Sequence, residues 1–232
     1  MRNAVKDRWY NLGASQLERI DAAGLRPRLL MQTCCAVCAC WPLLYLHRHF
    51  DMTLYYNNDN IYPFAEYQRR YDELVRYLAI FNDQHQADVK LVKTPYDGDN
   101  YLAKISVLAA EPERGRRCAL CFELRMRGAM AYAAAQGFDY FTTVMTVSRQ
   151  KDSDLLNRIG ERISADYPGV AYFHSDFKKR GGLEKGDAIA DANGLYRQNY
   201  CGCLYSYQDM LRRQAAKDAV VKALAGDDGD GR

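Results

Sequence analysis

Short apolar segments rich in β-branched and aromatic residues alternate with longer amphipathic segments along this chain, which restricts the folds that it can adopt. The expected strands are residues 28–33, 52–56, 89–93, 140–147 and 170–173. The expected helices are about residues 36–50, 66–86, 99–110, 118–136, 152–166, 183–192 and 207–224. Parallel strands joined by helices need right-handed crossovers, which place helices on both faces of the sheet. The sequence therefore predicts a Rossmann-like α/β fold with a mostly parallel sheet flanked by helices.

The length of the chain fits a single domain with a C-terminal helix. It has 232 residues, 48% of them hydrophobic and 26% charged, which is enough to bury one substantial core. We expect residues 1–27 to be a polar N-terminal extension without sustained periodicity, and residues 28–207 to form the α/β domain. Residues 208–232 should form a C-terminal helix that ends in a disordered acidic tail, GDDGDGR.

Hydropathy and charge exclude several classes of protein. The mean hydropathy is −0.44 and no run approaches the roughly 18 apolar residues of a membrane helix, so we expect no membrane partner. The N-terminus lacks the apolar region of a secretory signal, and we expect a cytoplasmic protein. With a net charge of only +3, affinity for a polyanion would need a local basic cluster. The phosphate-binding motifs GxGxxG and Walker A are absent.

Eight cysteines carry most of the functional information. A cytosolic chain does not depend on disulfides for its fold, so these thiols need another purpose. They form three groups, namely Cys34, Cys35, Cys38 and Cys40, then Cys118 and Cys121, then Cys201 and Cys203. The first group follows the first expected strand, and ligands of such sheets bind at the carboxyl ends of strands. The grouping is typical of ligands that converge in the fold.

The spacing of the first two groups is consistent with a metal centre. Cys118 and Cys121 would lie in the first turn of a helix, where the backbone dipole favours thiolates. Taken alone, this pair is equally consistent with a redox dithiol or half of a zinc site. Together with Cys34 and Cys35 it supplies enough thiolates for zinc or a [4Fe–4S] cluster, although adjacent cysteines suit a zinc knuckle poorly.

The third group differs because one residue separates its two cysteines. A disulfide between Cys201 and Cys203 would close a strained ring and would be easily reduced. This spacing favours a redox-active pair. The alternatives are two further metal ligands or two small residues of the core.

Several longer motifs occur together with these cysteines. They are Cys34-Cys-Ala-Val-Cys38, Asn58-Asp-Asn-Ile-Tyr-Pro63, Arg117-Cys-Ala-Leu-Cys-Phe-Glu-Leu-Arg125, Gly137-Phe-Asp-Tyr-Phe-Thr-Thr143, Asp176-Phe-Lys-Lys-Arg180 and Leu195-Tyr-Arg-Gln-Asn-Tyr-Cys-Gly-Cys-Leu-Tyr-Ser206. In these motifs and their order, the chain resembles the cobalamin-independent epoxyqueuosine reductases of the QueH type. The resemblance covers about residues 28–207, and the combination is far more specific than any single cysteine pair.

This resemblance implies a Rossmann-like iron-sulfur reductase that converts epoxyqueuosine to queuosine at the wobble position of tRNA, the last step of queuosine biosynthesis. It implies tRNA and an unidentified electron donor as partners, and no cobalamin. The residues that match the family's [4Fe–4S] ligands are Cys34, Cys35, Cys118 and Cys121, and those that match its redox-active disulfide are Cys201 and Cys203.

The resemblance also implies a second iron beside the cluster. Cys38 is well placed to bind it, one helical turn beyond Cys34 and Cys35, although a buried structural thiol is the alternative. Cys40 has no counterpart and is expected to be structural. Val37 replaces the usual proline, and the sequence Ser-Arg-Gln-Lys at 148–151 replaces Ser-Pro-His-Lys, which argues against a role for histidine there.

Proton donors and RNA contacts are chosen by their position in these motifs. Asp176 and Tyr200 are candidate proton donors, with loop stabilisation as the alternative. The candidate substrate contacts are Asn58, Asn60, Arg117, Lys179, Arg197 and Tyr200. Basic residues beside the motifs would raise the local potential for RNA, although an isolated basic run is usually a solvated surface.

Two other classes of function remain open. One is a zinc-stabilised RNA-binding module, which a colourless, zinc-loaded protein would favour. The other is a thiol–disulfide oxidoreductase acting through Cys201 and Cys203, which activity without iron would favour. Neither class explains the adjacent cysteines together with the redox-type pair.

Overall fold

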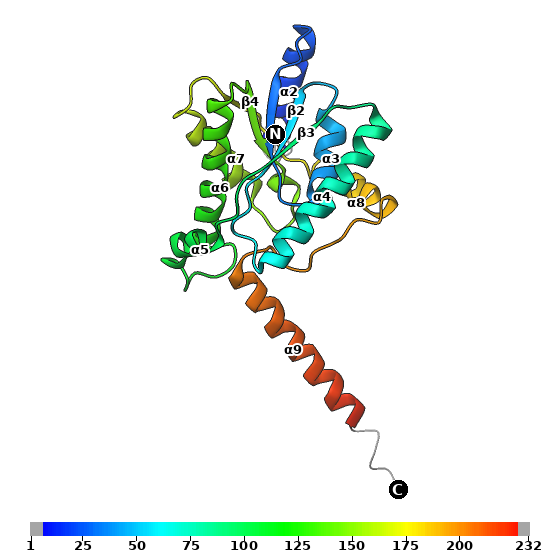
Figure 1. Ribbon diagram of the computed structural model, residues 1–232, viewed down its shortest axis with the longest axis vertical. Coiled ribbons are helices and arrows are strands. Elements are labelled where there is room, and N and C mark those ends of the chain that lie inside the picture. The colour runs from blue at the N-terminus through cyan, green and yellow to red at the C-terminus, as the bar shows by residue number, and fades with distance from the viewer. Residues whose placement is uncertain (1–6, 227–232) are drawn as a thin grey trace.

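The computed structural model describes residues 7–226 and contains a five-stranded parallel sheet (Figure 1). The strands are β1 (Arg28–Gln32), β2 (Asp51–Tyr56), β3 (Lys90–Lys93), β4 (Tyr140–Thr143) and β5 (Ala171–Tyr172). Their order is β3-β2-β1-β4-β5, and every adjacent pair is parallel. Leu29 of β1 pairs with Met52 on one side and Tyr140 on the other. The predicted Rossmann-like α/β fold is confirmed.

Helices cover both faces of this sheet. In chain order, the helices of the described residues are α2 (Arg8–Ala22), α3 (Ala36–Leu46), α4 (Phe64–His85), α5 (Gly98–Ser106), α6 (Arg116–Ala135), α7 (Ser153–Ser164), α8 (Gly182–Ala192) and α9 (Leu204–Gly226). Successive side chains of β1 point to opposite faces, so Leu29 and Met31 join the core under α3 and α4. Leu30 joins the core under α6 and α7. Figure 1 shows these two layers on either side of the strands.

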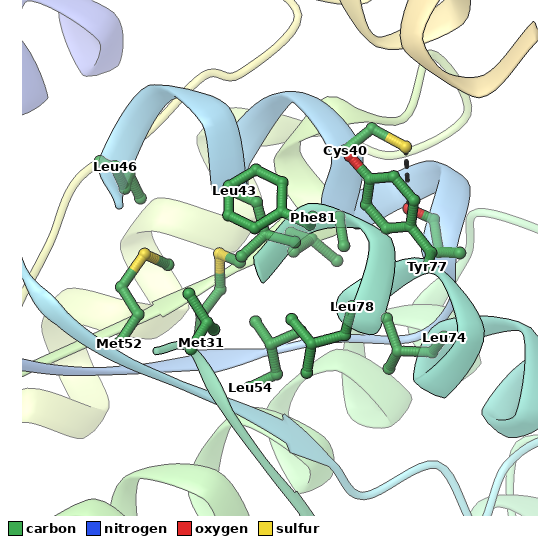
Figure 2. Close-up of a cluster of buried hydrophobic side chains, with 14 of the residues drawn as sticks. Met31, Cys40, Leu43, Leu46, Met52, Leu54, Leu74, Tyr77, Leu78 and Phe81 are labelled. Atoms are coloured by element: carbon green, nitrogen blue, oxygen red, sulfur yellow. Dashed lines mark hydrogen bonds between the residues drawn. The ribbon is translucent and has the colours of Figure 1, made fainter. Parts of the chain in front are cut away.

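The core under α3 and α4 also anchors the helix that carries the first cysteine group. Figure 2 shows Leu43 of α3 and Phe81 of α4 above Met31 and Leu54 of the sheet. Met31, Leu43 and Leu54 are fully buried, and each such side chain stabilises the fold by about 1.5–3 kcal/mol. α3 continues through Pro42, which lacks the N–H that would bond to the carbonyl of Cys38.

The prediction of one strand over residues 140–147 is wrong in its second half. β4 ends at Thr143, and Val144–Val147 form a 3₁₀ turn, η1. Thr143 Oγ1 accepts a hydrogen bond from the Met145 N–H at 3.2 Å and donates one to Gln32 Oε1 at 2.8 Å. These contacts outweigh the β propensity of the segment and turn the chain at the carboxyl end of the sheet.

The N-terminal segment contains regular structure that the sequence pattern did not reveal. α2 buries Trp9, Leu17 and Ile20, and Trp9 Nε1 donates a hydrogen bond to Asp154 Oδ1 at 3.0 Å. Gly13 lies so close to the next layer that a Cβ there would be 2.3 Å from the carbonyl oxygen of His174. The expected acidic tail lies outside the described residues beyond position 226. Within the described part of the chain, we find no helix with the length and apolar character of a membrane span.

Candidate active site

The first cysteine group lies where the strand order of the sheet reverses. β1 is central, with β2 on one side and β4 on the other, so the loops that follow β1 and β4 diverge at this point. Cys34 and Cys35 follow β1 directly, and Cys35 has an extended backbone at the start of α3. The Thr33 N–H donates to the carbonyl of Tyr55 at 2.9 Å, and Asn58 Nδ2 donates to the carbonyl of Thr33 at 2.8 Å. These bonds hold the cysteine-bearing turn against the neighbouring strand.

Three thiols of this group are close enough to share a metal. The Sγ atoms of Cys34, Cys35 and Cys38 all lie within 4.8 Å of one another. Those of Cys34 and Cys35 are 3.9 Å apart, and Gln198 Nε2 donates to Cys35 Sγ at 3.2 Å. Thiolate sulfur is the donor type of zinc and iron–sulfur sites. This donor set fits a metal ion, and among the described residues Cys118 and Cys121 are not part of the group.

The second cysteine group sits at the N-terminus of α6, as predicted. Cys118 Sγ accepts a hydrogen bond from the Arg114 N–H, and Cys121 Sγ accepts one from the Tyr101 hydroxyl, both at 3.2 Å. Burial raises the pKa of Cys121 to about 11. Hydrogen-bond donors aimed at both sulfur atoms suit thiolate ligands.

The third group is held by a buried arginine that the sequence analysis did not select. Arg70 on α4 donates to the backbone carbonyls of Cys201 at 3.1 Å and Tyr200 at 3.3 Å. Its Nε donates to Glu66 at 2.8 Å, and its side chain is 1% exposed. Gly202 has φ +134°, which only glycine adopts readily, and its carbonyl accepts the Tyr62 N–H at 2.7 Å. Arg70 and Gly202 thus set the course of the loop between the two cysteines.

A cavity of about 660 Å³ joins the three groups. Its wall includes Cys34 and Cys38 from the first group, Cys118 from the second and Cys201 from the third. This volume is in the range of small-molecule sites. The structure thus brings together cysteines that lie far apart in the sequence. Among the described residues, Cys35, Cys121 and Cys203 are not part of the wall.

Two cations lie beside these thiols. Burial disfavours the charge of Lys151, but the nearby sulfur atoms of Cys201, Cys34 and Cys38 outweigh burial and raise the pKa of Lys151. Hydrogen bonds from Cys35 and Cys38, followed by the charges of Lys151 and Arg125, hold the pKa of Cys34 well below its usual value. Both cations occur in or beside the motifs quoted above, but nothing in the sequence pattern showed that they face the thiols.

Cys40 lies on the other face of α3 and is fully buried in the hydrophobic core. Its Sγ donates to the carbonyl of Ala36 at 3.2 Å (Figure 2), and burial raises its pKa to about 12. This environment matches the structural role expected from the sequence.

Four predicted site residues already have protein partners. Asn58 is fully buried and accepts a hydrogen bond from Arg125 at 2.6 Å. Arg117 donates to the carbonyls of Leu108, Ala109 and Glu111. Lys179 forms an ion pair with Asp7 at 3.2 Å, and Arg197 pairs with Asp187 and Asp191 at 2.8 Å each. Among the described residues, none of the four is part of the cavity wall.

The remaining predicted residues differ in their access to the cavity. Tyr200 is in the wall, and its hydroxyl donates to the carbonyl of Tyr62 at 2.5 Å. Asn60 is buried, and its Oδ1 has no hydrogen-bond partner within the described part of the chain. Asp176 lies outside the wall, accepts from Ser153 at 3.1 Å and pairs with Lys178 at 2.7 Å.

Fold and site together define an α/β protein with a cysteine-lined cavity at the switch point of a doubly wound sheet. Residues 29–209 match the family model described as epoxyqueuosine reductase QueH. The chain therefore belongs to the QueH family.

Proteins named epoxyqueuosine reductase QueH are similar to this chain over most of its length. The one from Staphylococcus epidermidis is 36% identical over 209 residues, covering 88% of this chain and 86% of the relative. The one from Streptococcus pyogenes is 34% identical over 221 residues, covering 94% and 86%. The one from Thermotoga maritima is 24% identical over 190 residues, covering 81% and 94%.

Proposed function

We propose that this protein reduces epoxyqueuosine to queuosine at the wobble position of tRNA, the last step of queuosine biosynthesis. The observation that carries the proposal is the convergence of Cys34, Cys38, Cys118 and Cys201 on one cavity. The names of the protein's relatives and its membership of the QueH family support the same reaction.

The first two cysteine groups are the proposed metal ligands. Cys34, Cys35, Cys118 and Cys121 would hold a [4Fe–4S] cluster, and Cys38 would contribute to a site for an additional iron. When bound, these groups supply one-electron transfer and Lewis-acid polarisation of an oxygen atom. The protein contributes the hydrogen bonds to Cys35, Cys118 and Cys121 that fix the direction of each sulfur.

The third group balances the overall reaction. Removing the epoxide oxygen as water breaks two C–O bonds, forms the alkene, and consumes two electrons and two protons. Oxidation of the Cys201 and Cys203 dithiol to a disulfide releases the same two electrons and two protons. An electron donor, not yet identified, must then reduce the disulfide before the next turnover. The exposure of Cys201 gives such a donor access to it.

Charged and polar groups in the wall complete the proposed site. The ammonium group of Lys151 would stabilise negative charge that develops on the oxygen as it leaves. Tyr200 in the wall is the substrate contact that the geometry favours, whereas Asn60 lies outside the wall, although its Oδ1 is unpaired within the described part of the chain. The contacts of Asp176, Asn58, Arg117, Lys179 and Arg197 favour structural roles for these five residues.

The test begins with anaerobic purification and analysis of iron, sulfide, zinc and visible absorption, for the wild type, Cys118→Ala and the control Cys40→Ala. About four irons and four sulfides, lost only in Cys118→Ala, support the cluster. Conversion of epoxyqueuosine-containing tRNA to queuosine by the loaded wild type then tests the reaction. Zinc without sulfide after reconstitution would favour the RNA-binding module. Thiol–disulfide exchange with proteins, retained after iron removal, would favour the oxidoreductase.

A further inference from the structure

The C-terminal helix α9 projects from the domain. It has 23 residues, which corresponds to about 35 Å at 1.5 Å per residue. Figure 1 shows it leaving the body of the protein and ending far from the sheet. The side chains from residue 211 to residue 222 are all exposed. This part of α9 therefore does not pack on the domain described here.

The first turn of α9 is joined to the redox-type cysteine pair. Ser206 Oγ donates to the carbonyl of Cys203 at 2.9 Å and accepts the Gly202 N–H at 3.2 Å. The ring of Tyr207 packs against Tyr62, with centroids 5.6 Å apart, and against Tyr200, at 5.4 Å. These contacts fix the direction of the helix relative to the cavity.

One face of α9 carries positive charge outward from the cavity. Ser206, Met210, Arg213 and Lys217 follow one another at three- or four-residue spacing, so they lie on one face of the helix. Ser206 is at the cysteine loop, and Arg213 is in the cavity wall. We call Arg213 and Lys217 the basic stripe of α9.

The charges of this stripe are not compensated within the described part of the chain. Asp209 pairs with Arg212, and Asp218 accepts a hydrogen bond from Gln214 at 2.8 Å. Among the described residues, neither Arg213 nor Lys217 has an ion-pair partner, nor do Arg114 and Arg149, two exposed arginines of the cavity wall. The wall contains two acidic residues, and one of them, Asp152, caps α7. Glu113 is then the one acidic residue of the wall that is left to offset the positive charges there. The opening of the cavity thus has an excess of positive charge that continues along α9.

We infer that α9 is an RNA-binding arm whose basic stripe contacts tRNA backbone phosphates near the nucleotide that enters the cavity. This inference rests on the proposed function. A polyanion matches uncompensated arginine and lysine, and phosphate contacts fix the register of a nucleic acid on a protein. Because the first turn of α9 holds the Cys201–Cys203 loop, phosphates bound along the stripe would align the substrate with the reacting thiols.

The variant that tests this arm is R213Q/K217Q, and its matched control is R212Q/K222Q. Both pairs remove two positive charges from α9. Arg212 lies roughly 100° around the helix from Arg213, and Lys222 lies roughly half a turn away, so the control pair is off the stripe. The probe is the anticodon stem–loop RNA of a tRNA with guanosine at the wobble position, and its binding is followed by fluorescence anisotropy as a function of KCl.

We expect R213Q/K217Q to weaken binding at least tenfold at low salt and to reduce the salt slope by about 1.5, because two phosphate contacts are lost. R212Q/K222Q should weaken binding less than twofold. Equal losses of RNA affinity in R213Q/K217Q and R212Q/K222Q, or no loss in either variant, would overturn the proposal of an RNA-binding arm. So would a sedimentation experiment in which α9 pairs two copies of the chain through the exposed Leu211, Val220 and Val221.

This experiment does not depend on turnover, so it separates the arm from the proposed reaction. A wild type that binds the RNA through the stripe but leaves epoxyqueuosine unreduced would contradict the proposed function alone. If the wild type reduces epoxyqueuosine but R213Q/K217Q and R212Q/K222Q bind the RNA with equal affinity, the result would contradict the RNA-binding arm alone.

Discussion

At the scale of residues, two buried arginines and a half-buried lysine decide how the cysteines are held. Arg70, Arg125 and Lys151 come from different parts of the chain, and each faces a thiol or the backbone beside one. A buried cation is tolerated only when charges and hydrogen bonds satisfy it. These three residues therefore couple the stability of the fold to the geometry of the site.

Lys151→Met should lower the rate of epoxide reduction at least tenfold, because it removes the ammonium group that faces Cys34, Cys38 and Cys201. Lys151→Arg keeps the charge and should retain more activity. Single-turnover assays on protein with matched iron content measure both. Equal rates in the wild type and Lys151→Met would contradict the role.

Arg70→Met should lower the free energy of unfolding by about 3–5 kcal/mol, because it leaves Glu66 without its buried partner and frees two carbonyls of the cysteine loop. Arg69→Met is the control, since Arg69 is exposed and only stacks on Tyr196, which is worth about 0.5–1 kcal/mol. Urea denaturation compares the two variants, and similar losses would show that Arg70 has no special role.

At the scale of elements, α3 and the loop before α9 each have a divided role. α3 presents Cys38 to the cavity and Cys40 to the core, because residues two positions apart point to nearly opposite sides of a helix. The loop before α9 depends on Gly202 because its φ of +134° is strained for any other residue. Neighbouring residues of one element thus serve the site or the packing, depending on the direction in which each side chain points.

Cys40→Ala should leave the iron content unchanged and lower the free energy of unfolding by about 1–2 kcal/mol, since it removes a buried side chain. Cys38→Ala should have the opposite pattern, with iron lost and stability nearly unchanged. Metal analysis and urea denaturation on the same samples distinguish them. A loss of iron in Cys40→Ala would contradict the structural assignment.

Gly202→Ala should destabilise the cysteine loop by about 1–3 kcal/mol, because its Cβ would lie 3.2 Å from both Arg70 Nη1 and Ile61 Cγ1 at a positive φ. Gly24→Ala is the control, with φ +62° and no atom within 4 Å of the new Cβ. Alkylation rates of Cys201 should change in the first variant and not in the second. Unchanged rates in Gly202→Ala would show that the loop adapts.

At the scale of the whole molecule, the strand order places the site and α9 extends from it. The central position of β1 brings the loops after β1 and β4 to one end of the sheet, where the cavity forms. α6 and the loop before α9 complete its wall. The outer part of α9 adds nothing to the core, since its side chains from residue 211 to residue 222 are exposed.

Truncation of the chain after Lys217 should therefore change the free energy of unfolding by no more than about 0.5 kcal/mol, because residues 218–222 are exposed and exposed residues contribute little. Urea denaturation of the truncated and full chains measures the difference. A loss of more than about 2 kcal/mol would mean that the removed part of α9 is packed, either on this domain or on a second copy.

Local patterns were sufficient for much of the fold and for the identity of the cysteines. The strands that became β1 and β2 and the helices α4, α6 and α7 were predicted to within about two residues at each end, because their apolar periodicity reflects burial on the sheet. The prediction of one strand over residues 140–147 was wrong because the hydrogen bond from Thr143 to Gln32 joins distant parts of the chain. α2 was missed although its buried residues recur at three- or four-residue spacing, because this buried face is narrow and one of its four positions is a glycine.

The sequence by itself determined the α/β class, the three cysteine groups and the family, since each depends on residue type, spacing and order. Only the tertiary structure decided which polar residues face the cavity. Arg197 and Lys179 lie within site motifs but pair with carboxylates elsewhere. Lys151 and Arg213 instead lie in the cavity wall, and Arg70 donates to the backbone carbonyl of Cys201. The physical reason is that a charged side chain pairs with the groups that the fold places beside it, and these groups are often distant in the sequence.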